Sequence, residues 1–228
     1  MAERFVYFNN IEDIVSKRVA EYIKTAGYTP IFENIENIEN IGQYKPGLAG
    51  AVLANPPAAK MRGGIESTTD EMWRAARDAF AAPILDLTQK IGKILSENKK
   101  GSIIYLNSIH AEKPVGEGFL YTMGCAAVQA LCREAALIYG SFNVGCYNVM
   151  RGIVEGEEVY FTSEYSPLYH NGELRFPKER LPPADSLNEL CAFLLGGGAY
   201  ILNGTDLYAD EGFLMYYGKS DYYRDFVL

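Results

Sequence analysis

Two hydroxyl side chains, Ser108 and Tyr121, are the groups of this chain best suited to exchange protons with a bound molecule. Ser108 ends the run Gly-Ser-Ile-Ile-Tyr-Leu-Asn-Ser (101–108), and Tyr121 follows thirteen residues later at the start of a helical pattern. A free tyrosine has a pKa of about 10, so only about one in a thousand is phenolate at neutral pH. A neighbouring ammonium would lower that pKa and make acid/base catalysis efficient. One helical turn beyond Tyr121 lies Cys125, which supplies no positive charge.

The spacing of these three residues resembles the Ser…Tyr-x-x-x-Lys signature of the short-chain dehydrogenase/reductase family, with a cysteine at the lysine position. In that family the tyrosine is the general acid/base. The lysine lowers its pKa and binds the nicotinamide ribose. The resemblance therefore implies a catalytic site that is present in outline and lacks its cation.

Two further segments carry the resemblance, which covers residues 4–212. Residues 200–212 are similar to the family's C-terminal Y-I-T-G-x-x-L-x-V-D-G-G segment, with one inserted residue and with Glu211 in place of a glycine. Residues 148–152 resemble the N-x-x-x-P-G segment that follows the sixth strand, with Arg151 in the proline's place. Together with the serine and the tyrosine, these segments imply the family's fold.

The first strand–helix turn departs from the family pattern. Family members carry T-G-x-x-x-G-x-G there, whose glycines allow a tight turn and close approach of the backbone to the pyrophosphate. The threonine and the three glycines correspond, in that order, to Asn9, Asn10, Ile14 and Ser16. Ile14 would place a β-branched side chain where a phosphate should lie, so we expect no dinucleotide binding. Glu33 is either a ribose-binding acid or a surface glutamate, and the absent phosphate cradle favours the surface interpretation.

Other positions of the family's catalytic arrangement also differ. The turn N-N-A-G after the next strand is here Ala-Asn-Pro-Pro (54–57), and its two prolines make it rigid. The asparagine that supports the lysine through a water corresponds to Ala79. Lys113 and Arg133 are the nearest cations in sequence, but neither has the helical spacing of the lysine. Arg151 is an alternative cation, because its family position lies near the mouth of the active site.

Short apolar runs alternate with helical patterns along the chain, which indicates βαβ units and a mostly parallel sheet. We predict an α/β fold, a Rossmann-like doubly wound parallel sheet, in a single domain over residues 1–228. The longest helical pattern, 69–97, contains Pro83, which should kink it or mark a break. The predicted strands are 4–8, 28–32, 50–54, 102–106, 145–149 and part of 199–209; the other predicted helices are 13–26, 119–139 and 186–195.

Three segments stand outside this alternation. The Asn-Ile-Glu repeat at 34–41 predicts a local connector, such as a short helix or 3₁₀ turn, because so few units cannot form a solenoid. Residues 155–184 form an irregular, proline-rich region, expected to be a lid-like loop. The aromatic tail, 213–228, is an apolar strip, and we expect it to be buried at a subunit interface.

Composition argues against several classes of function. The formal net charge of −8 disfavours nucleic acid and anionic membrane as partners, since both need basic patches. No apolar run approaches the roughly 18 residues of a membrane span, and the first residues lack the pattern of a secretory signal. We therefore expect a cytoplasmic protein. The four cysteines form no C-x-x-C pair and are expected to be reduced thiols. With only His110, expected in a loop, and His170, no metal site or Ser-His-Asp triad is expected.

As a whole, the sequence predicts a degenerate member of this family that binds no NAD(P) and no other cofactor. Its function would be that of a catalytically inactive subunit. It would pair with an active paralogue of the same family in a hydroxyacyl-CoA-type dehydrogenase, a hetero-oligomer expected to be a heterotetramer. The helical patterns 69–97 and 119–139 correspond to those that form the family's main dimer interface. Ser108 and Tyr121 would then be vestigial.

Two alternatives stay open. The first is an active but atypical NAD(P)-dependent oxidoreductase that uses Tyr121 and Ser108, with Arg151 as the cation and the cofactor held by side chains such as Asn9 and Asn10. The second is a ligand-sensing binding module that kept the substrate cleft without the redox chemistry.

Overall fold

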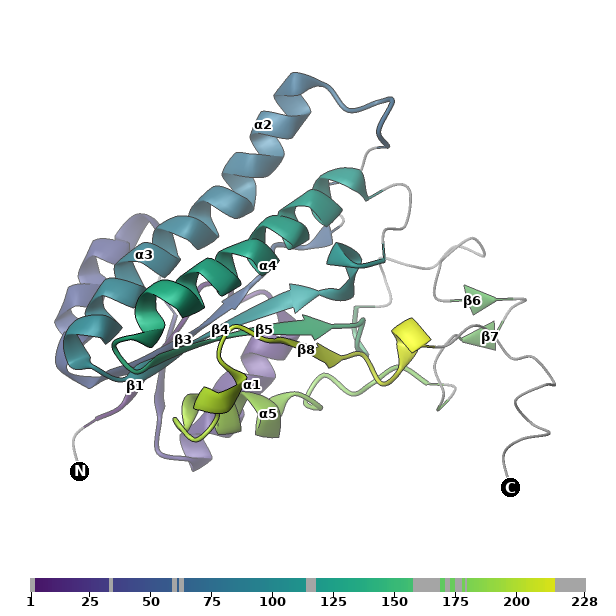
Figure 1. Ribbon diagram of the computed structural model, residues 1–228. Coiled ribbons are helices and arrows are strands. Elements are labelled where there is room, and N and C mark those ends of the chain that lie inside the picture. Colours follow the sequence, from purple (N-terminus) through teal and green to yellow (C-terminus); the bar gives the residue numbers. More distant parts are fainter. Residues whose placement is uncertain are drawn as a thin grey trace.

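Six parallel strands form one sheet in the order β2-β1-β3-β4-β5-β8 (Figure 1). The computed structural model describes residues 3–32, 35–58, 61, 64–113, 118–157, 169–170, 173–174, 178 and 180–215. The chain runs from β1 outward to β2 and then returns past β1 to β3, so the winding reverses between β1 and β3. This confirms the predicted single-domain, doubly wound α/β fold. The strands are β1 (Phe5–Phe8), β2 (Thr29–Phe32), β3 (Leu48–Ala54), β4 (Gly101–Ser108), β5 (Val144–Arg151) and β8 (Asp206–Ala209).

The central strands are buried on both faces, which explains their nearly continuous apolar sequences. Alternate side chains of each strand enter two separate cores. Tyr7, Leu53 and Tyr105 pack beneath one pair of helices, whereas their neighbours on the same strands pack beneath the other pair. The carboxyl ends of β3, β4 and β5 therefore open at one edge of the sheet, between these two layers.

Helices cover both faces of the sheet (Figure 1). One face carries α1 (Ile14–Thr25) and α5 (Asn188–Leu195), and the other carries α3 (Ala81–Asn98) and α4 (Phe119–Gly140). α2 (Asp70–Ala79) leads into α3 and points away from the sheet (Figure 1). No described helix is both long enough and apolar enough to cross a membrane.

The predicted helix over 69–97 is two helices, which meet at Phe80. Pro83 lies in the first turn of α3, where a missing backbone N–H breaks no intrahelical hydrogen bond. The break that the proline indicated is therefore confirmed, three residues before the proline itself. Thr69 caps α2 by accepting a hydrogen bond from the backbone N–H of Met72.

The predicted connector is confirmed, since Ile35–Gly47 forms 3₁₀ turns. The last predicted strand is shorter than its pattern, because Tyr200–Leu202 forms a 3₁₀ turn ahead of β8. The remaining strands, β6 (Tyr169–His170) and β7 (Glu173–Leu174), pair with each other in antiparallel fashion. Most of the predicted lid-like loop, all but three residues of the predicted aromatic tail, and Glu33 lie outside the described residues, so these interpretations stay predictions.

Candidate functional site

Ser108 is the last residue of β4 and organises the turn that follows it. Its hydroxyl accepts a hydrogen bond from the backbone N–H of His110 at 3.2 Å, which caps the 3₁₀ turn Ile109–Ala111. The same Oγ lies 2.8 Å from the Nδ1 atom of His110. The imidazole meets the ring of Tyr121 edge-on, with centroids 5.4 Å apart. The structure therefore joins three side chains of which the sequence had paired only the serine and the tyrosine.

Tyr121 lies in the first turn of α4 with its side chain buried. Burial raises the pKa of Tyr121 far above its ordinary value, and the neighbouring Cys125 raises it further. The charge of Arg151 and hydrogen bonds with Asn55 and Ser108 lower the pKa, but by less. The hydroxyl is therefore a neutral hydrogen-bonding group at physiological pH and a poor general base.

Cys125 stands where the family has its lysine, and it belongs to a network of neutral side chains. This thiol is fully buried, and burial raises its pKa to about 12. The Nδ2 atom of Asn55 donates to the Oδ1 of Asn107 at 2.8 Å and to the Cys125 Sγ at 3.5 Å. The Nδ2 of Asn107 in turn donates to the Cys125 carbonyl at 3.0 Å. Two amides and one thiol thus fill the space beside Tyr121 without adding any charge.

Phe80, rather than Ala79, is the residue from the α2–α3 junction that reaches this site. Ala79 is exposed at the end of α2. Phe80 is buried, and its ring centroid lies 5.5 Å from that of Tyr121. Phe80 was not predicted as a site residue, although the helix break indicated by Pro83 was a signal that the chain turns inward there.

The side chains of Asn9 and Asn10 are used by the turn after β1. Asn9 donates to the carbonyl of Ala54 at 3.0 Å and accepts from the backbone N–H of the same residue at 2.8 Å, which ties β1 to the end of β3. The Asn10 Oδ1 accepts from the backbone N–H groups of Glu12 and Asp13 at 3.0 and 3.2 Å. Both asparagines therefore hold the chain's own backbone.

A buried ion-pair network closes the N-terminal end of α1. Asp13 caps the helix, since its Oδ2 accepts from the backbone N–H of Ser16 at 2.7 Å. Its Oδ1 lies 3.0 Å from an Nη atom of Arg151, the last residue of β5. The two Nη atoms of Arg151 also grip the two carboxylate oxygens of Glu157, each at 2.9 Å. Burial alone would lower the pKa of Arg151, but Asp13 and Glu157 raise it above its ordinary value.

This arrangement does not fit a dinucleotide. The N-terminus of a helix attracts anions, and phosphate-binding turns exploit this. Here the anion at that end of α1 is the Asp13 carboxylate, with Glu157 close by, so a pyrophosphate would meet negative charge. The side chain of Ile14 packs against Gly156, since its Cδ1 lies 2.7 Å from where a Cβ on that glycine would be.

Ile14 and Ser16 were predicted from the sequence as altered positions, whereas Asp13 and Glu157 were not predicted as site residues. The Asp13 side chain could have been found from its type, since aspartate just before a helical pattern is a common N-cap. No pattern marked Glu157.

In the described part of the chain, no three His, Cys, Asp or Glu side chains gather as a metal site. All four cysteines are free and buried.

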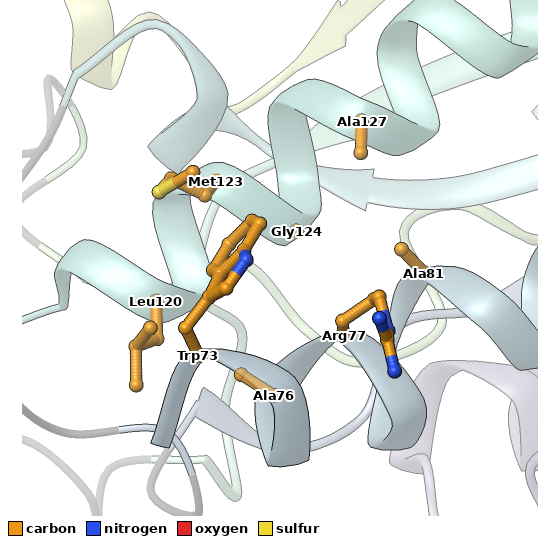
Figure 2. A pocket seen from close by; sticks show the side chains of 8 residues that line it. All are labelled: Trp73, Ala76, Arg77, Ala81, Leu120, Met123, Gly124 and Ala127. Atoms are coloured by element: carbon orange, nitrogen blue, oxygen red, sulfur yellow. The ribbon is translucent and has the colours of Figure 1, made fainter. Parts of the chain in front are cut away.

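A shallow apolar hollow lies between α2 and α4 (Figure 2). These helices lie on the side of the sheet away from α1 (Figure 1). The indole of Trp73 projects from α2 toward Met123 and Gly124 of α4 (Figure 2). Ala76 of α2 is buried and Met72 is half-buried against the core, whereas Trp73 is exposed, so part of the apolar side of this helix is uncovered. The hollow is lined by Trp73, Ala76, Arg77, Ala81, Leu120, Met123, Gly124 and Ala127.

Comparisons with known proteins extend over most of the chain. Residues 38–214 match the sequence profile of the family described as enoyl-(acyl carrier protein) reductase. An oxidoreductase of the short-chain dehydrogenase/reductase family from Burkholderia thailandensis superposes with a TM-score of 0.81 at 16% identity, over 99% of this chain and 98% of that one. A short-chain type dehydrogenase/reductase from Mycobacterium ulcerans gives 0.80 at 16% identity, over 98% and 94%. At such identities the structural likeness shows the fold alone.

One curated protein matches a shorter stretch. The Holliday junction branch migration complex subunit RuvB of Chlorobaculum parvum (strain DSM 263 / NCIMB 8327) is 32% identical over 77 residues, or 34% of this chain. The match spans only 19% of that protein's length. It therefore carries no argument about the activity of this chain.

Proposed function

The chain belongs to the short-chain dehydrogenase/reductase family, through its match to the enoyl-(acyl carrier protein) reductase profile, and from that premise we propose that it is a non-catalytic member that binds no NAD(P). The observation that carries this proposal is the Asp13–Arg151–Glu157 network at the N-terminus of α1. The two carboxylates there supply the negative charge that a dinucleotide phosphate would otherwise contribute. Cofactor binding would require burying further anions beside them or breaking both ion pairs.

The environment of Tyr121 supports the same proposal. Hydride transfer to a carbonyl, or from the corresponding alcohol, needs a proton partner whose pKa lies near the working pH. Burial raises the pKa of the Tyr121 hydroxyl, and the Cys125–Asn55–Asn107 network supplies no cation to bring it down. Ser108 and Tyr121 then act as buried hydrogen-bonding side chains that shape the end of β4.

We propose further that the chain pairs with an active paralogue of the same family in a hetero-oligomer, expected to be a heterotetramer. The support is the uncovered part of the apolar side of α2 and the hollow between α2 and α4 (Figure 2). A helix of ten residues is marginal in water without tertiary packing. A partner subunit would supply that packing, and the aromatic tail, 213–228, is proposed to add to the same assembly.

The chemistry proposed for the complex is that of a hydroxyacyl-CoA-type dehydrogenase. The pattern of lost motifs is similar to that of the non-catalytic subunit of the 2-[hydroxy(phenyl)methyl]succinyl-CoA dehydrogenase of anaerobic toluene degradation. In such a complex the active paralogue would hold the NAD and perform the hydride transfer. This chain would stabilise that subunit or complete its substrate pocket.

Titration of the purified chain with NADH and with NADPH, followed by nucleotide fluorescence and by calorimetry, tests the central proposal. We expect no saturable binding up to millimolar nucleotide. An intact family member titrated under the same conditions is the positive control. A micromolar dissociation constant for either nucleotide would overturn the proposal.

Pairing is tested by co-expressing the chain with an intact paralogue encoded near it and measuring the complex by native mass spectrometry. A Trp73→Glu substitution should weaken the complex, because it places a charge in the hollow between α2 and α4. Phe193→Glu is the matched control, since Phe193 is also an exposed aromatic residue but lies on α5, on the opposite face of the sheet. Equal loss of complex in both variants would contradict an interface at α2.

One observation favours the alternative of an active, atypical oxidoreductase: the charge of Arg151 does lower the pKa of Tyr121. In that case Tyr121→Phe should abolish turnover, whereas it should leave the complex of a non-catalytic subunit intact.

A ligand-sensing module would instead show a ligand-dependent rise in melting temperature, without redox chemistry, when screened against acyl-CoA esters and small carbonyl compounds.

A further inference from the structure

Arg151 lies at the same edge of the sheet as Ser108, Tyr121 and His110. It is the strand partner of Ser108 in the β4–β5 register. Burial lowers the pKa of His110, and the charge of Arg151 lowers it further. Burial raises the pKa of Tyr121, and the charge of Arg151 opposes that rise, so the guanidinium acts on both side chains. A group bound to Arg151 would therefore lie beside the hydroxyls of this edge.

The guanidinium has two carboxylate partners for its single charge. Glu157 meets it in a fork of two parallel 2.9 Å contacts, which is the planar geometry that arginine offers to any carboxylate. Asp13 makes one contact, at 3.0 Å. The cluster of Arg151, Asp13 and Glu157 therefore carries one net negative charge. It is also largely shielded from water.

The two carboxylates are not equally fixed. The Asp13 side chain is only 6% exposed and also caps α1, so removing it would cost both a cap and an ion pair. The Glu157 side chain is 20% exposed and comes from the loop after β5. Among the residues that the structure describes, its carboxylate also accepts a hydrogen bond from the backbone N–H of Val154, at 3.2 Å. Glu157 is therefore the more easily displaced of the two.

We propose that Arg151 is a recognition site for a small carboxylate ligand, and that Glu157 is a built-in occupant that keeps the site closed. A ligand carboxylate that takes the place of Glu157 restores the same two hydrogen bonds and leaves the charge of the cluster unchanged. A phosphate would bring more negative charge next to Asp13, so the site favours carboxylates. The proposal rests on the proposed function to the extent that no dinucleotide occupies the N-terminus of α1.

Chemical rescue tests this proposal. Glu157→Ala leaves Arg151 with a carboxylate-sized gap, and we expect its melting temperature to fall by several degrees. Sodium acetate should then raise it in a saturable way, as binding to the folded state requires. Sodium chloride at equal ionic strength should not raise this melting temperature, and sodium phosphate should raise it no more than chloride does.

The matched control is Glu155→Ala, because Glu155 is exposed on the same loop and makes no ion pair in the described structure. This variant should show no specific response to acetate.

A double variant, Glu157→Ala with Arg151→Met, checks that the rescue acts through the guanidinium, and it should lose the response to acetate. If Glu157→Ala does not fold, Glu157→Gln keeps the side-chain shape. Calorimetry should then show acetate binding to Glu157→Gln at least tenfold tighter than to the unaltered chain. The proposal is overturned if folded Glu157→Ala responds equally to acetate and chloride, or if Glu157→Gln gains no affinity. NADH titration of the same samples reports separately on the proposed function, because acetate rescue does not depend on it.

Discussion

The carboxylate of Asp13 and the guanidinium of Arg151 lie 3.0 Å apart, although 138 positions separate the two residues in the chain. The contact joins the N-terminus of α1 to the end of β5, across the carboxyl edge of the sheet. Related folds bind phosphate at such helix N-termini. In this chain the helix terminus, its anion and the counter-cation all belong to the fold, so their attraction contributes to the stability of the folded chain.

Replacing Asp13 should therefore be costly. We expect Asp13→Ala to lower the free energy of unfolding by about 3 kcal/mol, from about 1 for the helix cap and about 2 for the lost charged contact with Arg151, which keeps Glu157 as its partner. Asp13→Asn should cost about 1 kcal/mol less, because the amide still caps the helix. The control is Asp86→Ala, which removes an exposed pair with Lys90 and should cost less than about 1 kcal/mol. Urea unfolding followed by circular dichroism measures all three, and equal losses for Asp13→Ala and Asp86→Ala would refute a buried pair.

Gly124 on α4 has no room for a side chain, because Phe80 packs directly against it. A Cβ at this position would lie 2.1 Å from Cδ1 of Phe80, whose ring is buried beside Tyr121. We expect Gly124→Ala to destabilise the protein by about 2 kcal/mol, despite alanine's higher helix propensity. Gly198→Ala is the control, since the nearest atom there is 4.0 Å away, and it should stay within about 0.5 kcal/mol of the unaltered chain. Thermal unfolding distinguishes the two, and a neutral Gly124→Ala would show that the Phe80 ring can move.

The sequence predicted the sheet well because its signals are local. The apolar runs of β3, β4 and β5 are nearly continuous, as expected for strands covered on both faces, and the helical periods between them are long. Pro83 correctly marked a break in the longest helical pattern. The last strand was predicted only as part of 199–209; β8 occupies the end of that stretch, because Tyr200 and Ile201 have strand-like side chains but form a 3₁₀ turn.

The site was harder to predict, because its contacts join residues far apart in the chain. Ser108, Tyr121 and Cys125 were found from their spacing, and Asn9 and Asn10 from their place after β1. Their partners were not: the pairing of Asn55 with Cys125 spans 70 positions. Arg151 was noted as a cation for Tyr121, but its partners in the structure are carboxylates. Nothing in a single sequence shows which of several acidic residues will face a given arginine.

His110 should make stability fall in mild acid. Burial, and then the charge of Arg151, lower the pKa of His110 to about 4, whereas an unfolded histidine has a pKa of about 6.5. Between these values the unfolded chain binds a proton that the folded chain does not, so stability is full above pH 6.5 and declines as the pH falls toward 4. From pH 7 to pH 5 the expected loss is about 2 kcal/mol.

The comparison that isolates this effect is His110→Gln, measured by urea unfolding at pH 7 and pH 5. The variant should lack this part of the pH dependence, while carboxylate protonation affects both proteins alike. The groups that face the imidazole are the Ser108 hydroxyl, the Tyr121 ring and the charge of Arg151. Identical pH slopes in the two proteins would mean that His110 titrates normally in the folded state.

Restoring lysine at position 125 should not restore a dehydrogenase site. In Cys125→Lys an ammonium would replace a thiol that is fully buried, with Asn55 and Asn107 as its polar neighbours and with the charge of Arg151 acting on it. Burial and like charge both lower the pKa of such a lysine below its unfolded value of about 10.4. At neutral pH we expect a loss of about 3 kcal/mol or more, because a buried charge would have no counter-ion.

The sign of the pH dependence identifies the cause of that loss. The unfolded lysine keeps its proton up to about pH 10, whereas the folded one loses it earlier, so the stability of Cys125→Lys should rise with pH through the alkaline range. Cys125→Ala, which leaves a small cavity but no charge, should lose about 1 kcal/mol and show no such rise. Neither variant should oxidise NADH, because the Asp13–Arg151–Glu157 network still occupies the N-terminus of α1. A Cys125→Lys protein as stable at pH 7 as the unaltered chain would instead show that the pocket can hold a cation, and would favour the active, atypical enzyme.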